Sequence, residues 1–83
     1  MTGYPGLKQG HVIQQVEQDG AIIVLEDGAR FRAYSGFHNT CAAWQPEHMV
    51  RVKENPRNPE HPYKIINIHV NQEAEVQWLE GDE

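Results

Sequence analysis

Two aspartate-glycine pairs constrain the fold of this chain more than any other feature of its sequence. Asp19-Gly20 and Asp27-Gly28 separate three short apolar stretches that are rich in β-branched residues. Such a pair favours a tight hairpin, because glycine adopts a positive φ at little cost and aspartate can bond to its own backbone. The pattern predicts three consecutive antiparallel strands, at about residues 10–18, 21–26 and 29–34.

The register of these strands has two interpretations, which place different residues in the core. With two-residue loops in both turns, arginines fall among the apolar side chains, and one face holds Val12, Val16, Ile23, Leu25, Arg30 and Arg32. A three-residue loop in the first turn, closed by Gly20 in a bulge, gives an apolar face instead. That face consists of Val12, Val16, Ile22, Val24, Phe31 and Ala33. We predict this second register, which leaves Ile13, Ile23 and Leu25 to be covered by another segment.

The second half of the chain alternates between strand and turn signals. Residues 39–44 predict one helical turn, capped by Asn39 or Thr40 and ended by Pro46. Further strands are expected at 48–53, with Val50 and Val52 on one side, at 63–70 and at 74–79. Residues 54–62 contain three prolines, which predicts an extended, projecting loop that is either a connector or a recognition element.

The segment Trp44-Gln45-Pro46-Glu47-His48-Met49-Val50-Arg51-Val52 resembles the tryptophan-x-proline-glycine-aspartate-x-valine start of a strand in many bacterial SH3-like and OB-like barrels. Glu47 stands at the glycine position and His48 at the aspartate position. The resemblance implies an all-β fold, a small antiparallel SH3-like barrel of five to six strands with one short helical turn. It implies no function, since such barrels have unrelated roles. The predicted organisation is a flexible arm at 1–9, a single barrel domain at 10–79 and an acidic tail at 80–83.

Length and charge narrow the classes of function. A chain of 83 residues with 7 Lys and Arg against 12 Asp and Glu is one small acidic domain with a net charge of −5. That charge disfavours general binding to nucleic acid or to an anionic membrane. The chain has no long apolar run, no charged-then-apolar leader and a single cysteine, Cys41. We therefore expect a cytoplasmic protein without a membrane span.

No motif for catalysis or for a cofactor is evident. The five histidines form no paired ligand motif, and Cys41 follows His38 without a third partner at useful spacing. The sequence has no nucleophile elbow, phosphate loop or paired zinc-binding histidines. The predicted protein has no catalytic residues, no metal and no cofactor, and it is not an enzyme.

Cations at two-residue spacing are the clearest candidates for a binding surface. Arg30 and Arg32 share one face of the third predicted strand, and Arg51 and Lys53 share one face of the fourth. If these strands are neighbours, the four cations and Tyr34 form a local basic patch for a phosphate, a carboxylate or single-stranded nucleic acid. The favoured interpretation is a surface on which Glu17, Glu26, Glu75 and the acidic tail pair with these cations.

The two tryptophans have different expected roles. Trp44 is predicted to pack in the core at one end of the barrel. Residues 74–79, with Trp78 and Leu79, are predicted to dock on the face of Ile13, Ile23 and Leu25, either in the same barrel or in a second copy.

The predicted function is a small non-catalytic binding or interaction module with a protein partner. Its candidate contact residues are Arg30, Arg32, Tyr34, Arg51, Lys53, Trp78 and Leu79. The alternatives are an OB-like binder of single-stranded nucleic acid that uses the same basic patch, and a structural homodimer.

Overall fold

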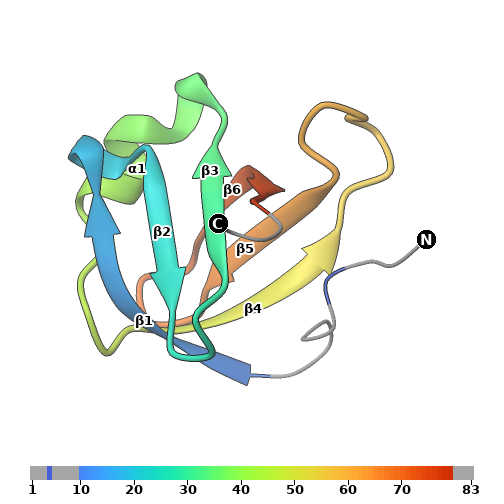
Figure 1. The fold of residues 1–83 in the computed structure, drawn as a ribbon. Coiled ribbons are helices and arrows are strands. Elements are labelled where there is room, and N and C mark those ends of the chain that lie inside the picture. Colours follow the sequence, from blue (N-terminus) through green and yellow to red (C-terminus); the bar gives the residue numbers. More distant parts are fainter. Residues whose placement is uncertain (1–3, 5–9, 80–83) are drawn as a thin grey trace.

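The computed structural model describes Tyr4 and residues 10–79, and it confirms a small all-β fold with one short helix (Figure 1). Six strands form a closed antiparallel barrel in the order β1-β2-β3-β6-β5-β4. They are β1 (Gly10–Glu17), β2 (Ile22–Leu25), β3 (Arg30–Ala33), β4 (Met49–Glu54), β5 (Tyr63–Asn67) and β6 (Gln72–Trp78). Strand β1 closes the barrel because it pairs with β2 along one edge and with β4 along the other.

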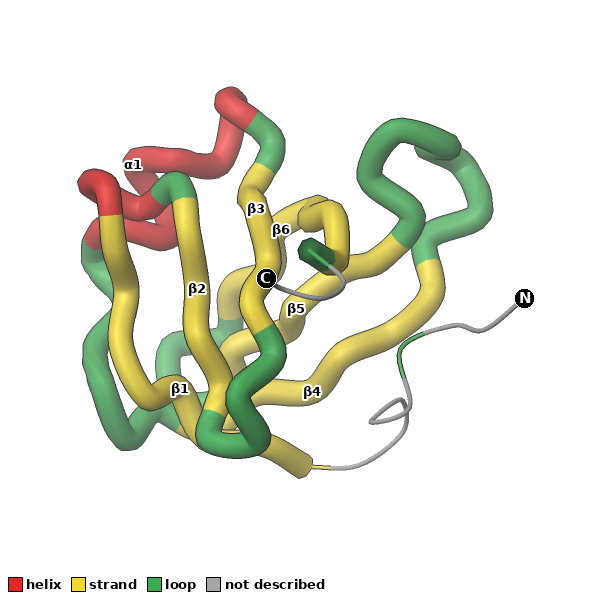
Figure 2. Tube along the Cα trace, viewed as in Figure 1, coloured by secondary structure: helices red, strands yellow, loops and turns green. Residues whose placement is uncertain are grey.

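The helical segments gather at one end of the barrel (Figure 2). They are the 3-10 turns η1 (Gln18–Gly20) and η2 (Ser35–Phe37) and the helix α1 (His38–Ala42). The predicted helical turn is present, but its predicted cap is wrong, because α1 follows directly from η2 and its N-cap is Phe37, without a side-chain hydrogen bond. Packing against the first hairpin stabilises so short a helix in place of a cap, since α1 and η1 lie in contact.

The barrel interior is filled by alternate residues of all six strands. Its buried apolar side chains include Ile13, Ile23, Leu25, Phe31, Ala33, Val50, Val52, Ile65, Ala74 and Val76. Trp44 is also buried, as predicted, and its Nε1–H donates to Oε1 of Gln72 at 2.9 Å. Burial of one large aliphatic side chain contributes about 1.5–3 kcal/mol, so this cluster supplies most of the favourable free energy of folding.

Phe31 and Ala33 face inward as predicted, but the predicted inward residues of β2, Ile22 and Val24, are wrong. Ile23 pairs with Phe31, and Val24 pairs with Arg30, so the inward face of β2 holds Ile23 and Leu25. The Leu25 N–H donates to the Ala29 carbonyl, which makes the second turn a three-residue loop, 26–28, closed by Gly28 with φ 86°. The three-residue loop is predicted for the first turn, between β1 and β2, but that turn contains the 3-10 turn η1.

A bulge in β1 sets the remaining register. Ile13 pairs with Leu25, but Gln15 pairs with Val24, so Gln14 is an extra residue between the two pairs. The bulge moves Val16 to the same side as Ile13, and Val16 packs against the core. A bulge therefore exists in the first hairpin, but it lies at Gln14 rather than at Gly20.

The Trp44–Val52 segment forms a tight turn followed by β4. The His48 N–H donates to the Gln45 carbonyl, and the Glu47 N–H donates to the Ile13 carbonyl. Glu47 occupies the position of the glycine in the SH3-like motif and keeps a positive φ of 79°. The turn thus retains a glycine-like backbone conformation with a non-glycine residue.

The loop between β4 and β5 is compact, so the prediction of an extended segment is wrong. The Asn55 N–H donates to the Pro62 carbonyl at 2.7 Å, and Nδ2 of the buried Asn55 donates to the His61 carbonyl. Asn58 Nδ2 donates to Oε1 of Glu75 on β6. Asparagine side chains thus supply bonds that the prolines cannot make, and they fold the loop back toward β6.

The two predicted terminal segments fall largely outside the described residues. Of the predicted arm at 1–9, only Tyr4 is described, and its side chain is buried in the core cluster. The predicted acidic tail at 80–83 lies outside the described residues. Within the described part of the chain, no helix is long and apolar enough to span a membrane.

Candidate functional site

The four candidate cations do not form one patch. Arg30 and Arg32 lie on β3, while Arg51 and Lys53 lie on β4. In the closed barrel, two strands separate β3 from β4 in either direction, β6 and β5 on one side and β2 and β1 on the other. The condition for a combined patch, that these strands are neighbours, is therefore contradicted, because the two pairs project from opposite sides of the barrel.

The two arginines of β3 differ in their surroundings. Both side chains are exposed, as expected for residues that alternate with the buried Phe31 and Ala33. Arg30 Nη2 lies 3.3 Å from Oε1 of Glu17, so one predicted cross-strand ion pair forms. Arg32 has no ion-pair partner among the described residues. Of the two other predicted anions, Glu26 lies beside His11, and Glu75 accepts from Asn58.

Arg32 borders an open groove of about 350 Å³ at the end of the barrel where the helical segments lie. The groove is lined by Gln18, Ala21, Ile22, Arg32, Ala33, Tyr34, Ser35, His38 and His61. Three small or aliphatic side chains from this set give it an apolar surface, and no carboxylate is among the lining residues. The groove thus has apolar walls and the guanidinium of Arg32, which has no ion-pair partner among the described residues. Such a surface is complementary to a partner with an anionic group beside a small apolar side chain.

Aromatic and imidazole rings form one wall of this groove. Tyr34 is 44% exposed, and its ring makes a T-shaped contact with the ring of His61, with centroids 5.0 Å apart. The Nδ1 atom of His61 is buried and has no hydrogen-bond partner among the described residues. His38 also lines the groove. Its Nε2 atom lies 3.1 Å from the Ala33 carbonyl oxygen, and this hydrogen bond holds the ring beside β3.

Trp78 and Leu79 lie at the end of β6 and are half-buried. Trp78 pairs with Phe31 and packs against the core, and the Leu79 N–H donates to the Arg30 carbonyl. The predicted contact of 74–79 with the face of Ile13, Ile23 and Leu25 exists within a single barrel, because β6 contributes Ala74 and Val76 to the same core cluster. The segment is a strand of the barrel rather than a cover laid over its outside.

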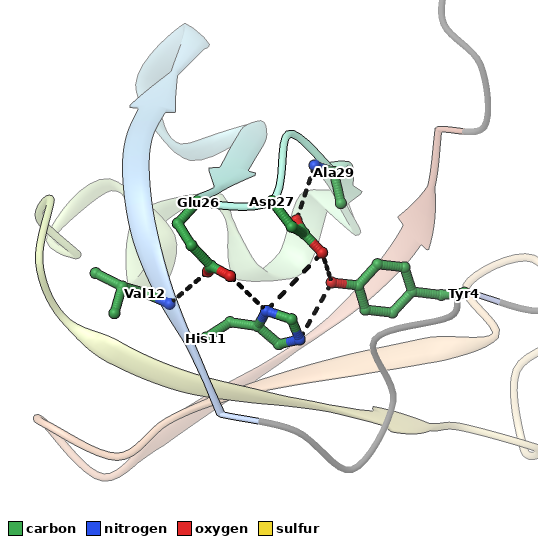
Figure 3. A network of polar contacts seen from close by, with 6 residues as sticks. All are labelled: Tyr4, His11, Val12, Glu26, Asp27 and Ala29. Atoms are coloured by element: carbon green, nitrogen blue, oxygen red, sulfur yellow. Dashed lines mark hydrogen bonds and ion pairs between the residues drawn. The ribbon is translucent and has the colours of Figure 1, made fainter.

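A polar network lies at the other end of the β2–β3 hairpin (Figure 3). His11, at the start of β1, pairs with the inward-facing Val50 and is buried. Its Nδ1 lies 3.1 Å from Oε2 of Glu26, and its Nε2 lies 3.3 Å from the Tyr4 hydroxyl. The Tyr4 hydroxyl donates to Oδ2 of Asp27 at 2.5 Å.

The network shifts the pKa of two of its members. Burial, followed by the hydrogen bond to Asp27, raises the pKa of Tyr4 far above its ordinary value, so its hydroxyl stays protonated. For Glu26, desolvation alone would raise the pKa, but the hydrogen bonds from the Val12 N–H and from His11, with the charge of His11, outweigh it and lower the pKa. The site therefore pairs a neutral phenol with an ionised carboxylate.

Two other candidate groups have structural roles. Burial raises the pKa of the Cys41 thiol to about 12, so it is a protonated core residue rather than a nucleophile paired with His38.

His48 stacks on His69 with ring centroids 4.4 Å apart, and its Nδ1 lies 3.0 Å from Nδ2 of the buried Asn67. The Gln45 N–H also donates to His48 Nδ1, so His48 closes its turn in the position of the motif's aspartate.

The network around His11 was not predicted from the sequence. Its residues come from three places in the chain, namely Tyr4, the start of β1, and the turn between β2 and β3. The available signal was the hairpin pattern itself, because pairing Ile13 with Leu25 brings His11 across from Asp27. The spacing of these residues gives no sign that they form a network, and Tyr4 lies in the predicted arm, outside the predicted strands.

The fold and the sites define a closed six-stranded antiparallel barrel with a cationic groove at one end of its β2–β3 hairpin and a polar network at the other. Comparisons of this chain with protein families, with curated proteins and with solved structures found no match.

Proposed function

We propose that the chain is a non-catalytic binding module that recognises a protein partner through the groove lined by Arg32 and Tyr34. The observation that supports this proposal is the position of Arg32, which has no ion-pair partner in the described part of the chain, beside an apolar surface in an otherwise acidic protein. A partner segment with an acidic side chain or a terminal carboxylate next to a small apolar residue fits this chemistry.

The energetics favour a peptide-sized contact. A charge-assisted hydrogen bond contributes about 1.5–3 kcal/mol, and burial of one aliphatic side chain adds a similar amount. The exposed ring of Tyr34 supplies apolar contact area with few rotatable bonds to immobilise. A bound polar group could also serve as a partner for Nδ1 of His61, which has no hydrogen-bond partner among the described residues.

The alternatives have less support. A binder of single-stranded nucleic acid needs several uncompensated cations along one path, and the two cation pairs lie on opposite sides of the barrel. A homodimer through Trp78 needs an accessible indole, whereas Trp78 already packs against Phe31 and lies 5.5 Å from the ring of Tyr4.

Selection from a random-peptide display library on the immobilised chain tests the proposal. We expect enrichment of peptides that contain an acidic residue beside a small apolar one. Fluorescence anisotropy on the individual peptides should then show affinity about tenfold lower for Arg32→Ala and unchanged for Arg51→Ala, its matched control on β4. Peptides that bind wild type and Arg32→Ala equally well would place the binding surface elsewhere.

A further inference from the structure

The network at the far end of the hairpin brings three possible metal ligands together (Figure 3). One ligand atom each from His11, Glu26 and Asp27 lies within 4.8 Å of the others. The His11 Nδ1 atom is the common member, at 3.1 Å from Oε2 of Glu26 and 3.9 Å from Oδ2 of Asp27. The imidazole is 4% exposed, while the two carboxylate side chains are 48% and 33% exposed, so an ion can reach the cluster from solvent.

Both carboxylates are held in place by the backbone. Oε1 of Glu26 accepts the Val12 N–H at 2.8 Å, and Oδ1 of Asp27 accepts the Ala29 N–H at 3.0 Å. One oxygen of each group is thereby anchored. The second oxygen of each group faces His11, and that of Asp27 also accepts the Tyr4 hydroxyl. Ligands that are already oriented in this way lose little freedom when an ion binds.

The hydrogen-bond partners determine which atoms of the cluster hold protons. The Tyr4 hydroxyl donates its single proton to Asp27, so it can interact favourably with His11 Nε2 only by accepting a proton from it. With a hydrogen on Nε2, the Nδ1 atom faces the two carboxylate oxygens either as the N–H of an imidazolium or, through its lone pair, as a ligand of a metal cation that the carboxylates also bind.

We propose that His11, Glu26 and Asp27 bind a divalent transition-metal ion, with zinc as the best match to the donor set. One imidazole nitrogen and two carboxylate oxygens are ligands that zinc accepts, and three protein ligands leave a fourth position for water. Metal-binding histidines usually donate their other N–H to a neighbouring oxygen, and the Tyr4 hydroxyl takes that role for His11. Tyr4 is thus a positioning residue for the ligand.

Calorimetric titration of the chelator-treated full-length chain with zinc chloride tests the site. We expect one zinc ion per chain, accompanied by a large shift of the His11 Nδ1 resonance in nitrogen-15 spectra of the histidine rings. The absence of stoichiometric heat, with the His11 ring resonances unchanged, would overturn the proposal in favour of the imidazolium. Zinc-dependent shifts at His48 and His69 without a shift at His11 would overturn it as well.

Matched variants separate a binding site from a general effect of charge. Glu26→Gln keeps a side-chain oxygen for the Val12 N–H but removes an anionic ligand, and we expect it to weaken zinc binding at least about tenfold. His69→Gln, an exposed histidine outside the cluster, should bind zinc as tightly as wild type. Equal affinity of Glu26→Gln and wild type would contradict the site. Circular dichroism shows whether each variant is folded, and the His11 ring shift in wild type decides the matter if Glu26→Gln does not fold.

Discussion

Single residues in left-handed backbone conformations fix the turns of this barrel. Gly20 and Gly28 both follow an aspartate and both have a positive φ, of 97° and 86°. Their surroundings differ, because a β-carbon on Gly20 would lie 2.6 Å from the Ala42 backbone nitrogen and closer still to the His38 carbonyl oxygen, whereas Gly28 has open space. The contact between the first hairpin and α1 therefore depends on Gly20, and Gly28 serves only its own turn.

Replacement of the two glycines should distinguish these roles. Gly20→Ala combines backbone strain with a clash against α1, so we expect a loss of about 3 kcal/mol or more in the free energy of unfolding. Gly28→Ala incurs only the backbone strain and should lose about 1 kcal/mol. Urea denaturation monitored by tryptophan fluorescence measures both values. Equal losses would show that η1 and α1 do not pack as described.

The cysteine provides a second test at the residue scale. Because burial raises the pKa of Cys41 to about 12, almost no thiolate exists at pH 8, and the side chain is inaccessible. The native chain should therefore react with an aromatic disulfide reagent orders of magnitude more slowly than the same chain in 6 M guanidinium, where we take about 8.5 as the thiol pKa. Rapid reaction of the native protein would contradict the buried position of Cys41.

At the scale of elements, the turn before β4 places a non-glycine residue in a left-handed backbone conformation. Glu47 adopts the conformation for which the SH3-like motif uses glycine, and His48 accepts the backbone bond from Gln45. The turn is held by its bonds to β1, since the Glu47 N–H donates to the Ile13 carbonyl and the Ile13 N–H to the His48 carbonyl. The strain at Glu47 is thus tolerated rather than removed.

Glu47→Gly should consequently stabilise the protein. Relief of a left-handed conformation is worth about 1 kcal/mol, and the greater freedom of glycine in the unfolded chain offsets part of it, so we expect a net gain of about 0.5 kcal/mol. Glu47→Ala is the control, because alanine is strained at the same φ and should bring no gain. A loss of stability in Glu47→Gly relative to Glu47→Ala would mean that the positive φ is not strained here.

The strands and turns differ in how well they could be predicted from the sequence. Alternation in β4 places Val50 and Val52 inside the barrel correctly, and the two aspartate-glycine pairs locate both hairpins. An aspartate-glycine pair is compatible with loops of two or three residues, however, and the bulge at Gln14 has no distinct sequence signal. The inward face of β2 depends on both. Nothing in the spacing of His11, Glu26 and Asp27 marks them as a cluster, so that cluster followed only from the structure.

For the whole molecule, closure of the barrel determines how charge is distributed. A single basic patch requires that β3 and β4 are neighbours, which the strand order contradicts, and strand order cannot be read from residue spacing. With cation pairs on opposite sides and a net charge of −5, no continuous basic path crosses the described surface. What remains on the β3 side is Arg32 and the groove beside it.

Because its cation pairs lie on opposite sides of the barrel, the whole molecule should bind single-stranded nucleic acid weakly. We expect the chain not to retard a single-stranded oligonucleotide in a mobility-shift assay at low salt, since counterion release requires several cations bound to adjacent phosphates. Retardation in wild type that disappears in the double variant Arg30→Ala/Arg32→Ala would favour the nucleic-acid alternative over a protein partner.

A nuclear magnetic resonance titration shows whether the groove on the β3 side is the binding surface. The nitrogen-15-labelled chain is titrated with the tightest peptide from the display selection, and amide shifts are mapped residue by residue. We expect shifts centred on Ile22, Arg32, Tyr34, His38 and His61, with Arg51 and Lys53 unaffected. Shifts centred on Arg51 and Lys53, or saturable binding without shifts around Arg32, would contradict this expectation.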